Sequence, residues 1–266
     1  MNFIEKIKKG IKINRARARC VLPNTTLAAI VRDEKMNPAG GIKWWAKNVL
    51  PYVEEGVIVD TGSVDGTREI LEELKSKFPH LRVYNHSWEG FADARNFSLK
   101  QVGTKRVLIL DADEVIADRG CTQNEIGIFD VKKGYEKLAQ HIEQTNSDGY
   151  HFHFQILHPN EKESRNCALL NPRIFNIGTR TFQTGYDGRH EHCNVNWINV
   201  NLGEVKNIKI NLAPIQIYHF VSSHEANKKK QGEWYREGRC LDEQPIENAR
   251  RNGWKEPNKV WRRKFR

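Results

Sequence analysis

The sequence predicts an α/β fold built on a mainly parallel sheet flanked by helices. From Thr25 onward, short apolar runs alternate with longer amphipathic ones, the pattern in which helices connect parallel strands. A turn rich in glycine and capping residues, 62–67, precedes apolar residues at helical spacing. The 266 residues suit one medium-sized domain. We therefore expect a basic segment 1–24, a folded domain 25–221, and a basic, helical extension 222–266.

The elements of the first half follow one another in a regular order. Strands are predicted at 27–31, 56–60, 81–85 and 106–110, and Ile70, Leu71, Leu74 and Phe78 predict a helix between the second and third. Beyond Asp113 the pattern loosens into a helix near 131–144, strands around 150–157 and 173–176, and a late strand at 215–220. We expect the first half to bind a ligand and the second half to vary.

Composition narrows the class of protein. The first residues lack the apolar run of a secretory signal, and no stretch of about 20 apolar residues could cross a bilayer. The five cysteines are scattered and never form C-x-x-C, so neither a zinc site nor a disulfide framework is indicated. These features predict a cytoplasmic protein.

The formal net charge of +10 is concentrated at the two ends of the chain. Residues 1–24 and 222–266 each carry +6, which leaves −2 for the middle. Such ends can bind nucleic acid or anionic lipid, or remain solvated. Apolar residues near helical spacing among the lysines of residues 3–12 predict a short helix that either lies on a membrane surface or packs against the domain.

Two carboxylates, Asp111 and Asp113, directly follow the apolar run 107–110. In an extended chain, side chains two positions apart share one face, and these would leave the sheet at its carboxyl edge, where open α/β sheets bind ligands. Paired carboxylates suit Mg²⁺ or Mn²⁺ held jointly with substrate phosphates. The alternative to a metal site is a structural role, in which the acidic end of the strand caps a helix.

A second acidic strand end lies one crossover earlier. Asp60 closes the run 57–59 and is followed by Gly62 and Gly66, which let the backbone turn tightly into the next helix. A carboxylate in this place can accept hydrogen bonds from a nucleobase or ribose. We expect Asp60 to form a wall of the same crevice as Asp111.

Four segments in this order resemble glycosyltransferase family 2, and in particular the bacterial and phage branch that includes enzymes of lipopolysaccharide core assembly. The segments are Ala29-Ile-Val-Arg-Asp-Glu34, Val59-Asp-Thr-Gly-Ser-Val-Asp-Gly-Thr67, Phe91-Ala-Asp-Ala-Arg-Asn-Phe97 and Leu110-Asp-Ala-Asp-Glu114. The resemblance covers roughly residues 27–116. It implies a GT-A fold, a nucleotide-sugar donor, commonly of the uridine diphosphate type, a divalent cation, and inversion at the anomeric carbon.

The resemblance also implies roles for individual residues. Arg32 and Glu34 would lie along the nucleoside, Asp60 would meet the base or ribose, and Arg95 would approach the diphosphate. Asp111 would face the ribose and the metal, and Asp113 would bind the metal directly. An ordinary surface ion pair is the alternative for Arg95, and a helix cap is the alternative for Asp93. The chain has Arg32-Asp33-Glu34 where the family more often has Lys-Asn-Glu, which puts the nucleoside contacts in question.

The second half offers further candidates. The segment 185–192 is dense in acids and histidines, and an inverting enzyme needs a general base, for which Glu191 is the first choice and Asp187 the second. A polar loop with satisfied histidines is the alternative. His219 ends the late apolar strand, where it is either structural or, as in related GT-A enzymes, a third metal ligand.

Two other functions stay open. A nucleotidyltransferase also needs a nucleotide crevice and paired carboxylates, although its usual Gly-rich basic loop is replaced here by residues 32–37. The basic ends, with Trp254, Trp261 and Phe265, could instead contact nucleic acid, which we do not favour. The acceptor is left open among a glycan, a lipid-linked saccharide and a protein, and peripheral membrane contact is compatible with each.

Overall fold

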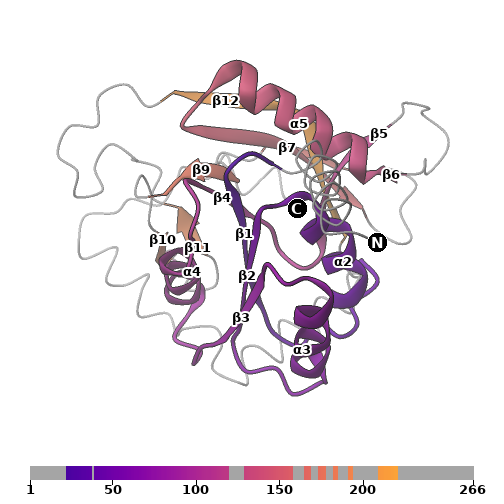
Figure 1. Cartoon of the computed structure of the whole chain (residues 1–266), viewed down its shortest axis with the longest axis vertical. Coiled ribbons are helices and arrows are strands. Elements are labelled where there is room, and N and C mark those ends of the chain that lie inside the picture. The colour runs from indigo at the N-terminus through magenta and orange to yellow at the C-terminus, as the bar shows by residue number, and fades with distance from the viewer. Residues whose placement is uncertain are drawn as a thin grey trace, which may run out of the picture.

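The computed structural model describes residues 22–37, 39–119, 129–157, 165–168, 173–177, 182–184, 191–193 and 209–220 (Figure 1). Ten strands in these ranges form one mixed sheet in the order β3-β2-β1-β4-β9-β7-β12-β5-β6, with β8 paired to β7. A separate hairpin consists of β10 and β11. The large sheet is the scaffold on which the predicted site residues are arranged.

The first half of the sheet is parallel. Its strands are β1 (Thr25–Val31), β2 (Glu55–Asp60), β3 (Leu81–Asn85) and β4 (Arg106–Ile109). Between them lie α2 (Ile42–Val49), the 3₁₀ helix η1 (Leu50–Tyr52), α3 (Thr67–Lys77) and α4 (Phe91–Lys100). This is the succession of strand, helix and strand that buries a parallel sheet on both faces.

The second half adds mainly antiparallel pairs. Its elements are β5 (Glu114–Arg119), β6 (Phe129–Asp130), α5 (Val131–Thr145), β7 (Gly149–Leu157), β8 (Arg165–Ala168), β9 (Ile174–Asn176), β10 (Phe182–Thr184), β11 (Glu191–Cys193) and β12 (Ile210–Phe220). β9 pairs antiparallel with both β4 and β7, and β12 pairs parallel with β7 and antiparallel with β5. The long β12 thereby returns the end of the described chain to the start of β5.

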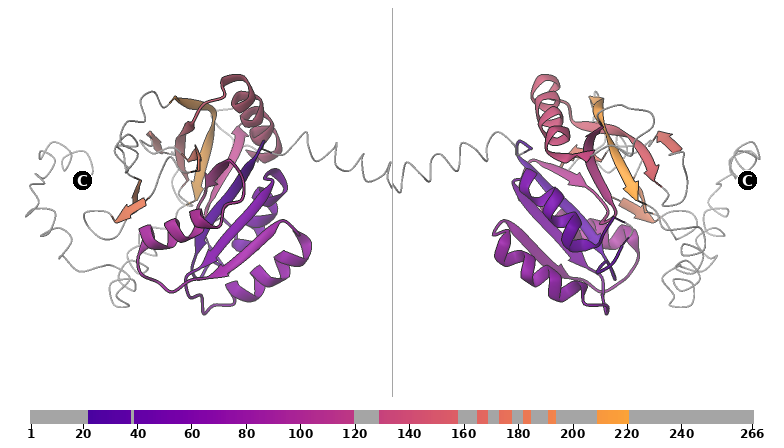
Figure 2. Two further views of the ribbon diagram at one scale, coloured as in Figure 1. Left: turned by 60° about the vertical axis from the view of Figure 1, so that its left-hand side comes forward. Right: turned by 90° about the vertical axis from the view of Figure 1, so that its right-hand side faces the viewer.

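Alternation along the central strands divides the core between two faces. Leu27, Ala29 and Val31 of β1 pack in the larger cluster with the apolar sides of α2, α3 and α5, whereas Ala28 packs with Ala92 of α4. The period of two follows from the pleat of a strand. Figures 1 and 2 show α4 on one face of the parallel half, with α2 and α3 on the other.

Helix α5 lies directly on β5 and β12. Gly134 makes this approach close, since a Cβ at that position would stand 2.7 Å from the Ala117 Cα. The contact needs a residue without a side chain, because real Cβ atoms do not approach backbone so closely. This packing holds β5, and with it the turn that precedes β5, against the rest of the sheet.

The predicted α/β class is confirmed, and so is its parallel half flanked by helices. All four strands predicted in the first half are present, and the late strand is longer than expected, beginning at Ile210 instead of residue 215. Helices α2 and α4 and strand β5 were not predicted. The charged residues of both basic ends lie outside the described residues, which begin at Leu22 and end at Phe220. No helix in the described part of the chain is both long and apolar enough to span a bilayer.

Candidate functional site

The carboxyl edge of the parallel strands gathers the predicted donor-site residues. β1, β2 and β3 end in register, with Val31 beside Asp60 and Asp60 beside Asn85. β4 runs parallel to β1 on its other side, so Asp111 emerges at the same edge. Residues from distant parts of the sequence therefore meet where open α/β sheets bind ligands.

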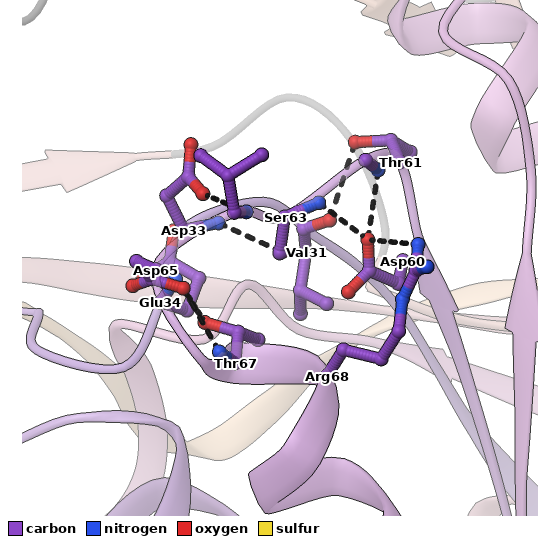
Figure 3. Close-up of polar contacts among 11 residues, drawn as sticks. Val31, Asp33, Glu34, Asp60, Thr61, Ser63, Asp65, Thr67 and Arg68 are labelled. Atoms are coloured by element: carbon purple, nitrogen blue, oxygen red, sulfur yellow. Dashed lines mark hydrogen bonds and ion pairs between the residues drawn. The ribbon is translucent and has the colours of Figure 1, made fainter.

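Asp60 uses one of its carboxylate oxygens to build its own turn. Its side chain is fully buried, and Oδ1 accepts hydrogen bonds from the backbone N–H groups of Gly62 (2.7 Å) and Ser63 (2.8 Å) (Figure 3). Arg68 Nη2 lies 3.7 Å from the same oxygen. Oδ2 is buried without a hydrogen-bond partner among the described residues. Because a buried acceptor without a partner costs free energy, Oδ2 is the atom suited to a ligand N–H or O–H.

The loop after β1 is joined to the loop after β2 by backbone-to-side-chain hydrogen bonds (Figure 3). Three consecutive backbone N–H groups donate across the gap: Asp33 to Ser63 Oγ (2.9 Å), Glu34 to Thr67 Oγ1 (2.8 Å) and Lys35 to Asp65 Oδ2 (2.9 Å). The backbone that carries Arg32 and Glu34 is thus fixed relative to Asp60. The two loops form one wall of the site.

Asp33, the departure from the family pattern, has a role in building this wall. Its φ of 56° lies in the left-handed region, which Asp and Asn tolerate better than most residues, and its Oδ1 accepts from the Val64 N–H at 2.8 Å. An Asn side-chain oxygen could accept the same bond. Since the contact is internal to the loops, it gives the acid a structural role within the wall.

The Asp111-Ala112-Asp113 segment is a turn, so the expectation that its two carboxylates share one face of an extended strand is wrong. β4 ends at Ile109, and the Glu114 N–H donates to the Asp111 carbonyl at 3.0 Å. The turn directs the two carboxylates to different partners. Asp111 forms an ion pair with Arg95 of α4, and Asp113 faces His219.

Arg95 is buried to 1% exposure, whereas its partner Asp111 is 38% exposed. An ordinary surface ion pair does not describe a cation held this deep, because burying a guanidinium is costly unless it is paired. Asp93, in the same helix, is not the cap of α4, because Gly90 occupies that position. The Asp93 carboxylate instead lies 2.5 Å from His86 Nε2.

His219 is brought to the site by the second half of the sheet. β12 runs antiparallel to β5 with His219 opposite Glu114, and the Phe220 N–H donates to the Asp113 carbonyl at 2.9 Å. His219 Nε2 lies 3.4 Å from Asp113 Oδ2. Two residues that are more than 100 positions apart in the sequence thus converge at the turn.

Glu114 and Arg173 form a buried pair beneath the turn that sequence reasoning did not single out. Glu114 is 1% exposed; its Oε2 accepts from the Asp111 N–H at 2.9 Å, and its Oε1 accepts from Arg173 Nη2 at 2.7 Å. Arg173 also lies over the Phe154 ring, 5.0 Å from its centroid. Glu114 stands beside Asp113 in the sequence, but only the pairing of β9 with β4 brings Arg173 to it.

The charges at the turn shift the pKa values of the acids and the histidine in different directions. Burial alone would raise the pKa of Asp111, but the charges of Arg95 and Arg173 hold this pKa below its usual range. Burial, together with Asp111 and Asp113, raises the pKa of Glu114 despite Arg173. Although burial alone would lower it, the hydrogen bond and charge of Asp113 raise the pKa of His219 to about 9. The two arginines therefore favour the carboxylate form of Asp111.

The described residues fit a divalent cation in part. No group of three or more His, Cys, Asp and Glu side chains converges within the described ranges. Asp113 and His219 do approach each other, and they offer an oxygen and, once a cation displaces the proton of His219, a nitrogen of the kinds that Mn²⁺ accepts. Two protein ligands are enough where substrate phosphates and water complete the shell. Asp111 is held by Arg95 instead.

The candidates for the general base are described only in part. Glu191 begins β11, opposite Thr184 of β10, and this hairpin contacts α4, the helix that carries Arg95. The backbone of Glu191 is thus placed next to that helix. Asp187 lies outside the described residues.

Comparison with known proteins assigns the family. The model of glycosyl transferase family 2 matches residues 46–193, which is more than half of the chain. Among curated proteins no match was found. The matched range includes the Asp60 turn, Arg95 and the Asp111-Ala112-Asp113 turn.

Solved structures support the fold. The chain is similar to Staphylococcus aureus TarS 1–349, with a TM-score of 0.52 and 16% identity over 90% of this chain and 77% of that one. The chain is also similar to TarS 1–349 in complex with UDP, with a TM-score of 0.50 and 16% identity over 89% of this chain and 74% of that one. The match to the longer S. aureus TarS structure has a TM-score of 0.50 and 17% identity, and it covers 83% of this chain but only 41% of that one.

The family match and the site agree with each other. The match supports sugar transfer over nucleotidyl transfer, and the fold similarity covers both halves of the sheet. The chain therefore belongs to glycosyltransferase family 2 and is a glycosyltransferase with a GT-A fold.

Proposed function

We propose that the chain transfers a sugar from a nucleoside diphosphate sugar, of the uridine diphosphate type, with the help of a divalent cation. The observation that carries the proposal is the meeting, at one edge of the sheet, of the buried Asp60 oxygen, the Arg95–Asp111 pair and the Asp113–His219 pair. The similarity to TarS 1–349 in complex with UDP supports a uridine donor.

The nucleoside would lie against the wall formed by the two joined loops. Asp60 Oδ2 would accept from a base N–H or a ribose hydroxyl, since this oxygen is buried at the wall and has no hydrogen-bond partner among the described residues. Arg32 and Glu34 would line the same wall, whose backbone is fixed by Ser63 and Thr67. This wall holds the part of the donor that is remote from the reacting carbon.

The diphosphate would lie over the Asp111-Ala112-Asp113 turn. Sugar transfer builds negative charge on the departing diphosphate, and positive groups placed there stabilise it. Asp113 and His219 would hold Mn²⁺ or Mg²⁺ against the diphosphate oxygens, and the cation would supply positive charge where the leaving group develops. Arg95 pairs with Asp111 and would orient it, and Asp111 would then face the ribose and the cation.

The first test is a thermal-shift comparison of nucleotide sugars with and without Mn²⁺. A uridine diphosphate sugar with Mn²⁺ should raise the melting temperature by mass action. Asp113→Asn should retain the metal-free melting temperature, lose the Mn²⁺-dependent increase, and lower turnover by about 10²-fold or more. Asp118→Asn is the matched control, because Asp118 pairs with Lys133 and Lys137 near the far end of β5. Normal turnover of Asp113→Asn would show that Asp113 does not bind the cation.

We propose inversion at the anomeric carbon, with Glu191 as the general base and Asp187 as the alternative. The base removes the acceptor proton as the acceptor attacks, so its amide variant should lower kcat by about 10²-fold while donor affinity is kept. Kinetics of Glu191→Gln and Asp187→Asn at saturating donor would identify the residue. If neither variant lowers kcat, the base lies elsewhere. The acceptor class, glycan, lipid-linked saccharide or protein, requires a separate acceptor screen.

A further inference from the structure

Asn37 links the loop after β1 to the Asp111-Ala112-Asp113 turn. Its Nδ2 donates to the Ala112 carbonyl at 2.8 Å. Its Oδ1 accepts from the backbone N–H groups of Ala39 (3.0 Å) and Gly41 (2.9 Å). Since Oδ1 faces two N–H donors, the opposite orientation of the amide would place an NH₂ group against them. The hydrogen bonds therefore fix which end of the amide faces Ala112.

The loop that holds Asn37 is tightly constrained. Gly41 has a φ of 88°, and a Cβ there would stand 2.3 Å from the Lys35 carbonyl oxygen. The Gly40 N–H donates to the Asn37 carbonyl at 3.0 Å, and the Ile42 N–H donates to the Glu34 carbonyl at 2.8 Å. Asn37 is thus held firmly relative to Glu34 and to the start of α2.

Several contacts hold the turn, and two of its hydrogen bonds come from the segment after β1. Glu114 Oε2 accepts from the Asp111 N–H, Asn37 holds the Ala112 carbonyl, and Trp45 Nε1 donates to the Glu114 carbonyl at 2.8 Å. The Asn37 bond is the one at the centre of the turn, between the two carboxylates. The same segment also carries Arg32 and Glu34 of the nucleoside wall.

We propose that Asn37 is a positioning residue that sets the carboxylates of Asp111 and Asp113 relative to the nucleoside wall. Its effect on the donor rests on the proposed function, whereas its effect on the turn does not. A small misplacement of groups that bind the diphosphate costs affinity and rate, because these groups act through geometry. Asn37 has no need to touch the donor to exert this effect.

Asn37→Asp isolates the proposed bond. The variant keeps the oxygen that accepts from Ala39 and Gly41, but it turns the donor facing Ala112 into a second carboxylate oxygen. Two acceptors then face each other, and the anchor becomes repulsive. Asn48→Asp is the matched control, because Asn48 Nδ2 also donates to a backbone carbonyl at 2.8 Å, that of Trp44 within the same segment.

The first measurement is hydrogen exchange of the peptide that covers residues 110–115, without donor. Loss of one hydrogen bond at the turn should speed exchange by about tenfold in Asn37→Asp. Exchange in Asn48→Asp should match the wild type. Unchanged exchange in Asn37→Asp would overturn the proposal, whether or not the chain binds a nucleotide sugar.

The second measurement is Mn²⁺ affinity by electron paramagnetic resonance in the presence of UDP, together with donor KM and kcat. Asn37→Asp should weaken Mn²⁺ and raise donor KM by about tenfold each, and the metal-free melting temperature should fall no further than in the control. Faster exchange with unchanged Mn²⁺ affinity and KM would overturn the positioning role. Wild-type protein that binds neither Mn²⁺ nor UDP would count against the proposed function, and the exchange result would still judge the link to the turn.

Discussion

The two carboxylate oxygens of Asp60 have different surroundings. One oxygen stabilises the local turn, and the other has no protein partner among the described residues. Oδ1 accepts two backbone hydrogen bonds that close the turn at Gly62 and Ser63. Oδ2 has no hydrogen-bond partner among the described residues, although the side chain is buried. A change confined to Oδ2 should therefore affect the ligand and spare the turn.

Asp60→Asn makes this change, because Asn keeps an oxygen for the turn and replaces Oδ2 by an NH₂ group. Losing a buried hydrogen bond to a charged acceptor should raise donor KM by about tenfold or more, with kcat nearly unchanged, since the contact is remote from the reacting carbon. Steady-state kinetics over a range of donor concentrations measures both. Asp130→Asn is the control, as either residue can cap α5. An unchanged donor KM would show that Asp60 does not contact the donor.

At the residue scale, the sequence predicted which groups lie at the carboxyl edge of the sheet better than it predicted how they are held. The apolar run before Asp111 and Asp113 correctly placed both acids at this edge, but nothing in their spacing indicated a turn, or that Arg95 and His219 would hold the two acids apart. Arg173 and Asn37 carried no recognisable pattern. Their partners, Glu114 and Ala112, come from distant segments, and such contacts are decided by tertiary packing.

At the scale of elements, periodicity succeeded where the buried face is apolar. The strands of the parallel half were predicted because their apolar runs are buried on both faces. Helix α4 was missed because its buried face consists of Ala92, Ala94, Arg95 and Ser98, which lack a strong apolar stripe. The buried charge of Arg95, which pairs with Asp111, interrupts the apolar face of the helix and so weakens the pattern.

Helix α2 was a different kind of omission. Ile42, Trp45, Ala46 and Val49 are buried at helical spacing, so the pattern was present in the sequence. The antiparallel pairs of the second half could not be read in the same way. β12 meets β5 and β7 across long separations in the chain, and its pairing with β7 is irregular between Leu212 and Gln216. Register of this kind depends on the whole sheet.

At the scale of the whole molecule, the candidate site lies at the carboxyl ends of the parallel strands, and a carboxylate with several partners lies at their amino ends. Glu55 lies at the amino end of β2, away from the site. Its Oε2 accepts from Thr26 Oγ1 (2.7 Å) and from the Gly103 N–H (2.8 Å), and its Oε1 pairs with Arg82. One carboxylate thus joins the amino ends of three parallel strands to the segment that leads into β4.

Glu55→Gln should destabilise the protein and leave donor KM and kcat unchanged. Burial alone would raise the pKa of Glu55. The hydrogen bonds from Thr26 and Gly103 and the charge of Arg82 outweigh burial and hold this pKa below its usual range. The stabilisation is therefore complete above the unfolded-state pKa and is lost as pH falls through the folded-state pKa. Urea unfolding at pH 7 should show a loss of about 1 to 3 kcal/mol, and the difference from the wild type should shrink below about pH 4.5. Glu54→Gln, at an exposed neighbour, should change neither quantity. A difference that persists unchanged at low pH would show that the charge of Glu55 is not what joins the strands, and a changed donor KM would show that the two edges are coupled.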